Sequence, residues 1–388
     1  MNIQSKLYEV TKIPDLTLSK YEALEESGVE GVLKKHKSFL RQIHRTALLS
    51  NQSIHWIYEY DPERPKGKRL RIFIRFDGGT ANDYTDILIK NSPLSPYFDI
   101  SPSENAINQN TYRYMAILIK KEKFSLADRH DTGYFYSVNK WAMNEDARLY
   151  SLLTMLQNMN SRCIYCADVL PVDFSGTIEQ PDMLGNIMRA LRNMLTVRVE
   201  KSGSITSLQH DESADYTLER YKDLIKDISA NPHFIANIRV YADSPEYAGM
   251  LIDAAASDAL DEGSHDILLN TGNFSPSIEG SQVRDFCDPK TPRELKFWPV
   301  LFMLKELVPF VTLPALYPGE SIEMPKETAP NYDSQGLLLG KDNDDYEVHI
   351  PLKNLPKHVF IAGVPGSGKT NSMLHIATEL HRYSIPFL

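Results

Sequence analysis

Residues 358–370 read HVFIAGVPGSGKT, and this stretch decides the fold expected for the C-terminal part of the chain. Residues 359–362 form an uninterrupted apolar run, the pattern of a strand buried on both faces of a parallel sheet. After the loop, apolar residues recur at the i, i+3, i+4, i+7 spacing of an amphipathic helix, at Met373, Ile376, Ala377 and Leu380. The stretch therefore predicts a strand, a tight loop and a helix in that order.

The loop itself matches the phosphate-binding pattern G-x-x-x-x-G-K-[ST]. Glycines let the backbone turn sharply and approach a phosphate with no Cβ in the way. Successive backbone N–H groups at the positive end of a helix then form a nest for an anion. We expect Lys369 to contact the β- and γ-phosphates of ATP and the Thr370 hydroxyl to bind Mg²⁺. The residues predicted to hold the nucleotide are Gly363, Val364, Pro365, Gly366, Ser367, Gly368, Lys369, Thr370 and Asn371.

An ATPase of this kind also needs an acidic residue at the end of a later apolar strand, to support the Mg²⁺ shell and position water. The sequence ends at Leu388, just after a second apolar segment opens with SIPFL. Upstream, Asp77 closes the run RIFIRFD, but Arg75 interrupts that run and a hairpin is predicted there. The expectation is a fragment that keeps the phosphate loop and lacks the acid, so no catalytic residue is assigned.

Upstream of the loop, the sequence alternates between strand and helix patterns. Period-two alternation over 52–60 and 69–76 predicts a hairpin, as do 336–340 and 347–351. A strand–helix–strand pattern occurs over 133–169 and again over 234–269, with Asn144 and Ser244 as the expected helix caps. Further helices are expected over 18–45, 182–199, 214–229 and 292–308.

These patterns divide the chain into five segments. They are an N-terminal helical segment (1–45), a first α+β module (46–180), a helical insertion (181–232), a second α+β module (233–317), and a linker, hairpin and phosphate loop (318–388).

Composition excludes several classes of protein. With 42 Lys+Arg against 51 Asp+Glu, the net charge is −9, so a protein held to DNA by an overall positive field is excluded, although a local basic channel is not. No apolar run approaches the ~18–20 residues of a membrane span, and the N-terminus lacks the apolar middle of a signal peptide. Three cysteines do not make a disulfide scaffold, so a cytoplasmic location is expected.

The segment from Leu337 to the end of the chain resembles the HerA-type ATPases of the HerA/FtsK superfamily. The likeness is carried by the phosphate loop together with Leu337, Leu339, Gly340, Ile350, Pro351, Lys357, His358, Asn371, Ile385, Pro386 and Phe387. Members of that family are hexameric P-loop motors, many of them DNA translocases or helicases. Their acidic strand, sensor residue and intersubunit arginine have no identifiable counterpart here, so hydrolysis by this chain alone is not expected.

The resemblance implies a fold of mixed α/β and α+β class, with an α+β front region followed by the truncated start of a RecA-like core. It implies ATP and Mg²⁺ as ligands. For the full-length form it implies double-stranded DNA as partner, assembly into a homo-hexamer, and work in DNA processing, conjugation or phage defence. Two alternatives stay open: an ATPase of the conjugative or type IV secretion kind, and a non-catalytic fragment that acts as an interaction module.

Weaker signals favour ordinary structural roles. Cys163 and Cys166 form a C-x-x-C, but a zinc site needs two more ligands, and residues three apart in a strand face opposite sides. A basic hairpin could follow a nucleic-acid backbone, although a solvated charged surface is the favoured interpretation; it comprises Arg64, Lys66, Lys68, Arg69, Arg71 and Arg75, with Trp56 and Tyr58 on the partner strand. The same preference holds for Lys120, Lys121 and Lys123, and for the loop of His210, Asp211 and Glu212.

Overall fold

The computed structural model divides the chain into two compact units, residues 1–325 and 326–388. It describes residues 5–16, 29–78, 84–104, 111–126, 134–144, 147–174, 179–194, 197–198, 208–209, 212–262, 265–276, 288–317, 319–325, 336–341, 347–352, 360–364 and 366–386. The class is mixed α+β, as the sequence predicts.

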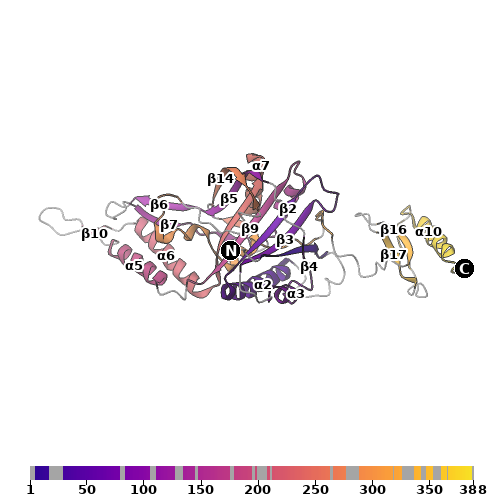
Figure 1. Ribbon diagram of the computed structural model, residues 1–388, viewed down its shortest axis with the longest axis horizontal. Helices are drawn as coiled ribbons and strands as arrows, with labels where there is room; N and C mark the ends of the chain where they lie inside the picture. Colours follow the sequence, from indigo (N-terminus) through magenta and orange to yellow (C-terminus); the bar gives the residue numbers. More distant parts are fainter. Residues whose placement is uncertain are drawn as a thin grey trace. The chain divides into compact units, whose positions relative to one another are not determined.

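The larger unit is built on an antiparallel sheet, nine-stranded within the described residues (Figure 1). The strand order is β14–β5–β12–β9–β2–β3–β1–β4, and β15 pairs with β12 beside this path. The strands are β1 (Ser5–Lys12), β2 (Gln52–Tyr60), β3 (Leu70–Gly78), β4 (Asp99–Pro102), β5 (Tyr112–Lys120), β9 (Cys163–Val172), β12 (His233–Ala242), β14 (His265–Phe274) and β15 (Leu301–Met303).

The predicted first hairpin is confirmed, with β2 and β3 paired from Gln52 opposite Gly78 to Tyr60 opposite Leu70. The two predicted strand–helix–strand patterns join at the centre of the same sheet, where β9 pairs with β12 along its length. Strands from residues 46–180 and from 233–317 therefore share one sheet and one core rather than forming separate layers.

Three helices cover one face of this sheet: α2 (Val29–Ser50), α4 (Tyr150–Gln157) and α7 (Pro245–Ala259). Alternate strand residues such as Trp56, Ile74 and Val240 point into that layer, and their neighbours such as Ile57, Phe73 and Tyr241 form a second apolar cluster on the opposite face. In Figure 1, α2 and the short α3 (Tyr84–Lys90) lie below β2 and β3. Both faces of the central strands are buried.

A satellite layer forms around a second hairpin, β6 (Glu122–Leu126) and β7 (Tyr134–Val138). Helices α5 (Glu179–Met194) and α6 (Glu212–Ala230) pack with it around Trp298. The helices predicted over 182–199 and 214–229 are therefore present, with shifted ends. Two further short strand pairs are β8 (Ala142–Met143) with β13 (Leu260–Glu262), and β10 (Val197–Arg198) with β11 (Leu208–Gln209).

The Ser244 cap is confirmed and the Asn144 cap is wrong. The Ser244 hydroxyl accepts a hydrogen bond from the Tyr247 N–H at 3.4 Å at the start of α7. Helix α4 begins at Tyr150, where Asp258 Oδ2 accepts from the N–H groups of Ser151 and Leu152. Because a carboxylate from α7 supplies the cap, Asn144 is not needed there, and its amide donates to the Asp258 carbonyl instead.

Two other helix predictions need correction. The predicted helix 292–308 is wrong: the segment contains 3₁₀ turns at Arg293–Leu295, Trp298–Val300 and Val308–Phe310, the strand β15, and the single turn α9 (Leu304–Leu307). Pro299 has no N–H to donate, so a continuous helix is interrupted there. The helix predicted over 18–45 is found as α2 at 29–50, and residues 17–28 lie outside the described part of the chain.

The smaller unit contains a hairpin, β16 (Leu337–Lys341) with β17 (Glu347–Ile350), and the helix α10 (Lys369–Arg382). The predicted hairpin and helix are thus confirmed. The prediction of a strand buried on both faces is wrong for residues 360–362, which are not in a strand, and Phe360 is 91% exposed. A buried parallel strand needs strands beside it, and the described residues of this unit place only β16 and β17 in a sheet.

Candidate nucleotide-binding site

Two glycines give the predicted loop its turn into helix α10. Gly366 has φ +86° and Gly368 has φ +83°, a left-handed conformation that side chains with a Cβ rarely adopt. Gly368 is the N-cap residue of α10, so the loop leads directly onto the first turn of the helix. The first N–H groups of a helix have no acceptor within the helix, so the first N–H groups of α10, directly after the loop, can donate to an anion.

At position 363 a glycine is needed because there is no space for a side chain, rather than because of the backbone angles. A Cβ at this position would lie 2.3 Å from Ser367 Oγ and 3.5 Å from Lys369 Cγ. The two ends of the loop therefore approach each other within the space that a side chain would fill. The Ser367 N–H donates to the Val364 carbonyl at 3.1 Å and closes the turn.

Lys369 bonds to its own loop. Its ammonium donates to the Val364 carbonyl oxygen at 2.9 Å and also to the Gly363 carbonyl oxygen. A phosphate oxygen is a charged acceptor and forms stronger hydrogen bonds than a neutral carbonyl. The lysine is therefore held at the loop by contacts that an anion can replace.

Contacts with the hairpin fix the position of α10. His375 Nε2 lies 2.7 Å from the Leu338 carbonyl oxygen, and the Tyr383 hydroxyl donates to the Gly336 carbonyl at 2.9 Å. Gly336 in turn approaches Ile350 so closely that a Cβ would meet its carbonyl oxygen at 2.2 Å. Within the described residues, these contacts attach α10 to the hairpin of β16 and β17.

Thr370 and Asn371 are exposed in the first turn of α10, so the Thr370 hydroxyl is accessible to a magnesium ion at the loop. Pro365 lies outside the described residues. Glu379 is buried on the same helix, nine residues further on and about 13 Å along its axis from Thr370, with Arg382 3.5 Å away. The hydroxyl and backbone donors fit a nucleotide with Mg²⁺, while Glu379 is too far along the helix to serve as the acid. Across the described ranges, no group of three His, Cys, Asp or Glu residues could hold a metal ion.

Asp77, the rejected upstream acid, lies at the end of the β2–β3 hairpin opposite Ser53 and is buried. Its Oδ2 lies 3.3 Å from His55 Nε2 and 3.1 Å from Arg75 Nε. Burial raises the pKa of this carboxyl, but the hydrogen bond from His55 and the charges of His55 and Arg75 outweigh it, so the net shift is downward. Asp77 is an ionised partner in a buried network.

The two cysteines have the predicted structural role. Cys163 and Cys166 are fully buried on β9 and belong to apolar clusters on opposite faces of the sheet. Burial raises the pKa of the Cys163 thiol to about 12 and also raises that of Cys166, so both stay protonated at neutral pH.

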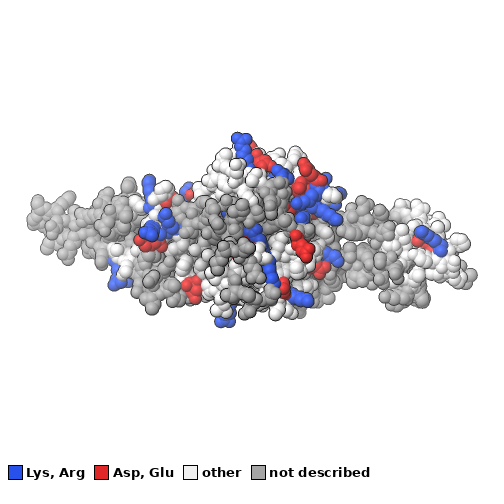
Figure 2. Space-filling model, in the orientation of Figure 1, with Lys and Arg blue, Asp and Glu red and all other residues white. Residues whose placement is uncertain are grey.

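The basic hairpin does not form a stacking surface for nucleic acid. Trp56 and Tyr58 are buried in the core. Arg71 forms a bidentate ion pair with Glu9 at 2.8 and 2.9 Å, and Arg75 is buried beside Asp77. Figure 2 shows Lys and Arg atoms interspersed with Asp and Glu atoms on the visible described surface. The interpretation as a solvated charged hairpin fits Lys66 and Lys68, which are exposed.

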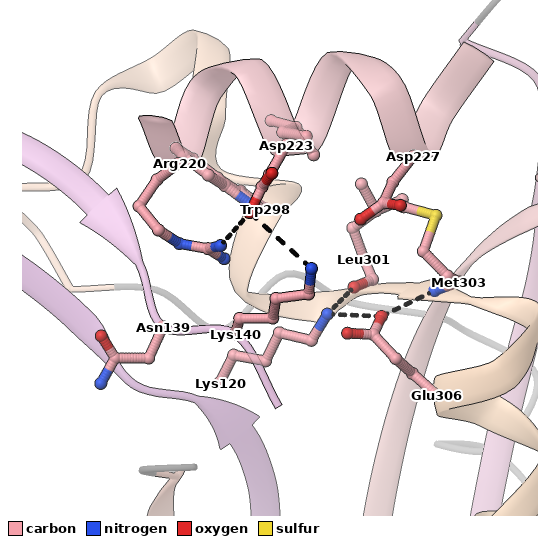
Figure 3. Close-up of a pocket in the computed structure, with 11 residues that line it drawn as sticks. Lys120, Asn139, Lys140, Arg220, Asp223, Asp227, Trp298, Leu301, Met303 and Glu306 are labelled. Atoms are coloured by element: carbon pink, nitrogen blue, oxygen red, sulfur yellow. Dashed lines mark hydrogen bonds and ion pairs between the residues drawn. The ribbon is translucent and has the colours of Figure 1, made fainter. Parts of the chain in front are cut away.

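The Lys120 cluster also has internal partners. The Lys120 ammonium donates to the Leu301 carbonyl at 2.7 Å and to Glu306 Oε2 at 2.8 Å (Figure 3). These groups lie in a small hollow that Arg220 and Asp223 also line. Lys123 lies 3.9 Å from the centre of the Tyr216 ring. Opposite charges meet across this hollow, so it does not present a single charge to a ligand. His210 and Asp211 lie outside the described residues.

No protein-family model matches this chain, and no curated protein matches it. Among the described residues, no helix is both long and apolar enough to cross a membrane.

Proposed function

We propose that the loop at 363–370 binds the phosphates of ATP with Mg²⁺, and that the chain is the front part of a HerA-like ATPase. The observation that carries this proposal is the backbone of the loop, in which two left-handed glycines lead onto the N-terminus of α10 with Lys369 in its first turn. A nucleotide triphosphate needs many donors that converge with little side-chain bulk, and this arrangement supplies them.

In the proposed complex, the N–H groups around Gly366–Thr370 donate to phosphate oxygens, and Lys369 exchanges its carbonyl partners for the β- and γ-phosphates. The Thr370 hydroxyl binds the magnesium ion. Mg²⁺ supplies charge neutralisation between the β- and γ-phosphates.

For the full-length form we propose that a RecA-like ring moves double-stranded DNA with the energy of ATP hydrolysis. The test is whether DNA stimulates ATP hydrolysis by that form. The alternative is a secretion-type ATPase, which association with a membrane complex would favour. Residues 1–388 are proposed to bind nucleotide weakly and without turnover, since positioning and charge stabilisation supply nearly all catalysis in phosphoryl transfer. They are also proposed to form a hexamer poorly.

The test is calorimetric titration of residues 1–388 with ATP and Mg²⁺. Lys369→Ala should weaken binding at least tenfold, because a charge-assisted hydrogen bond to phosphate is lost. Arg382→Ala is the matched control, since it removes a cation from the far end of the same helix. Equal ATP affinity in wild type and Lys369→Ala would contradict the assignment of this loop as the nucleotide site. Phosphate release that depends on Lys369 would contradict the proposed lack of hydrolysis.

A further inference from the structure

Helix α2 is amphipathic, and its outer face is basic. Its inner face packs on the large sheet through residues such as Phe39 and Ile43, which are fully buried. On the opposite side of the helix, Lys37, Arg41 and Arg45 are exposed. Residues four apart in a helix lie above one another, so these three cations form a stripe about 12 Å long.

The cations of this stripe have no acidic partner among the described residues. Residues 31–50 of α2 include no Asp or Glu. Across the described ranges, neither the Lys37 ammonium nor the guanidinium groups of Arg41 and Arg45 form an ion pair. The charge of the stripe is therefore available to an outside partner, and a cluster of such cations attracts an anionic surface.

Large aliphatic side chains are exposed at the C-terminal end of the stripe. Leu49, in the last turn of α2, is 86% exposed, and its neighbour Leu48 is also exposed. The Ser50 hydroxyl hydrogen-bonds to the Tyr84 hydroxyl, which holds the start of α3 against this end of α2. Ile87, one turn further along α3, is 65% exposed. Cations beside exposed aliphatic residues are typical of surfaces that bind anionic lipid headgroups and insert apolar side chains beneath them.

From this arrangement we propose that the stripe together with Leu48, Leu49 and Ile87, the α2 surface, binds a bilayer that contains anionic phospholipid. The cations contact the phosphate and carboxylate groups of the lipid headgroups. Leu49 and Ile87 enter the boundary between headgroups and acyl chains. The net charge of −9 does not prevent this contact, because charges farther than about 10 Å away are largely screened at physiological ionic strength.

The aliphatic residues favour a lipid surface over a nucleic acid. The phosphates of duplex DNA would also attract the stripe, but they offer no apolar environment to Leu49 and Ile87. A bilayer satisfies both parts of the α2 surface. This surface belongs to the larger unit and goes beyond the function proposed above, so a failure to bind lipid leaves the nucleotide proposal unchanged.

The first test is co-sedimentation of residues 1–388 with phosphatidylcholine vesicles that contain about 30% phosphatidylserine. A variant with all three cations of the stripe changed to Gln should bind at least tenfold more weakly, because each cation near an anionic surface contributes about fivefold. The control variant Lys66→Gln, Lys68→Gln, Lys226→Gln removes the same charge from exposed sites elsewhere and should bind like wild type. Wild type that stays in the supernatant, or an equal loss in the control, overturns the proposal.

A second test separates lipid from nucleic acid. The double variant Leu49→Gln, Ile87→Gln should weaken vesicle binding about fivefold or more, because it removes the side chains that enter the bilayer. Met250→Gln, Leu269→Gln changes two other exposed apolar residues of the larger unit and should bind like wild type. Vesicle binding that the Leu49 and Ile87 substitutions leave unchanged overturns the proposal. So does binding of duplex DNA that depends on the stripe and occurs without binding to vesicles.

Discussion

Gly363 approaches Ser367 so closely that a Cβ on the glycine would lie 2.3 Å from Ser367 Oγ and 3.3 Å from Ser367 Cβ. The first and fifth residues of the phosphate loop therefore share one small space. The fixed glycine of the motif is explained here by contact, whereas Gly366 and Gly368 are explained by their backbone angles.

Gly363→Ala should weaken ATP binding at least tenfold, because the new methyl group forces the loop open. In a Ser367→Ala background the same substitution should cost clearly less, since the closest atom, Ser367 Oγ, has been removed. The measurement is calorimetric titration of the four variants with ATP and Mg²⁺. Equal penalties in both backgrounds would show that the loop is not held by this contact.

Ser244→Ala should lower the free energy of unfolding by about 1 kcal/mol, because α7 loses the hydroxyl that accepts from the Tyr247 N–H. Urea denaturation of the larger unit measures this change. Ser229→Ala, an exposed serine inside α6, serves as the control and should stay within about 0.5 kcal/mol of wild type. A Ser244→Ala variant as stable as the control would rule out the cap as a stabilising contact.

Arg239→Met should destabilise the larger unit by roughly 3–5 kcal/mol, because it leaves the fully buried Asp168 carboxylate without its arginine partner. The double variant Arg239→Met, Asp168→Leu should recover much of that loss, since removing both charges also removes their desolvation cost. Denaturant unfolding of the single and double variants tests the coupling. Additive losses would mean that the two side chains do not depend on each other.

The sequence predicts a local element well where its hydrophobic pattern and the turn or capping residue that bounds it lie close together in the chain. The β2–β3 hairpin and helix α7 with Ser244 are examples, since alternation, a turn and a capping hydroxyl all lie within a few residues of each other. The phosphate loop is equally local, because its geometry depends on three glycines and a lysine within one short segment.

Features that depend on distant residues were not predictable. Period-two alternation assigns one face of β2 to solvent and makes His55 a surface residue, yet strands from both halves of the chain meet so that both faces are buried. The buried contact between His55 and Asp168 was missed for this reason, since 113 residues separate the two. The one available signal was the presence of His55, Asp168 and Asn237 among apolar residues in three strands of strong β pattern.

The last prediction concerns pH and rests on His36 in α2. His36 Nδ1 donates to the Val32 carbonyl at 2.9 Å, and His36 Nε2 accepts from the Leu313 N–H, also at 2.9 Å. Both ring nitrogens are therefore satisfied only in the neutral imidazole, because a proton on Nε2 would face the Leu313 N–H. Burial lowers the pKa of His36 from 6.5 to about 4.

Because this pKa is lower in the folded than in the unfolded state, the stabilisation is fully present above pH 6.5 and is lost as the pH falls toward 4. The loss attributable to His36 should be about 3 kcal/mol over that interval. His36→Gln should be less stable at pH 7, and its free energy of unfolding should fall less steeply between pH 6.5 and 4 than that of wild type. Urea unfolding at each pH measures both slopes, and parallel slopes would show that His36 is not the group that titrates.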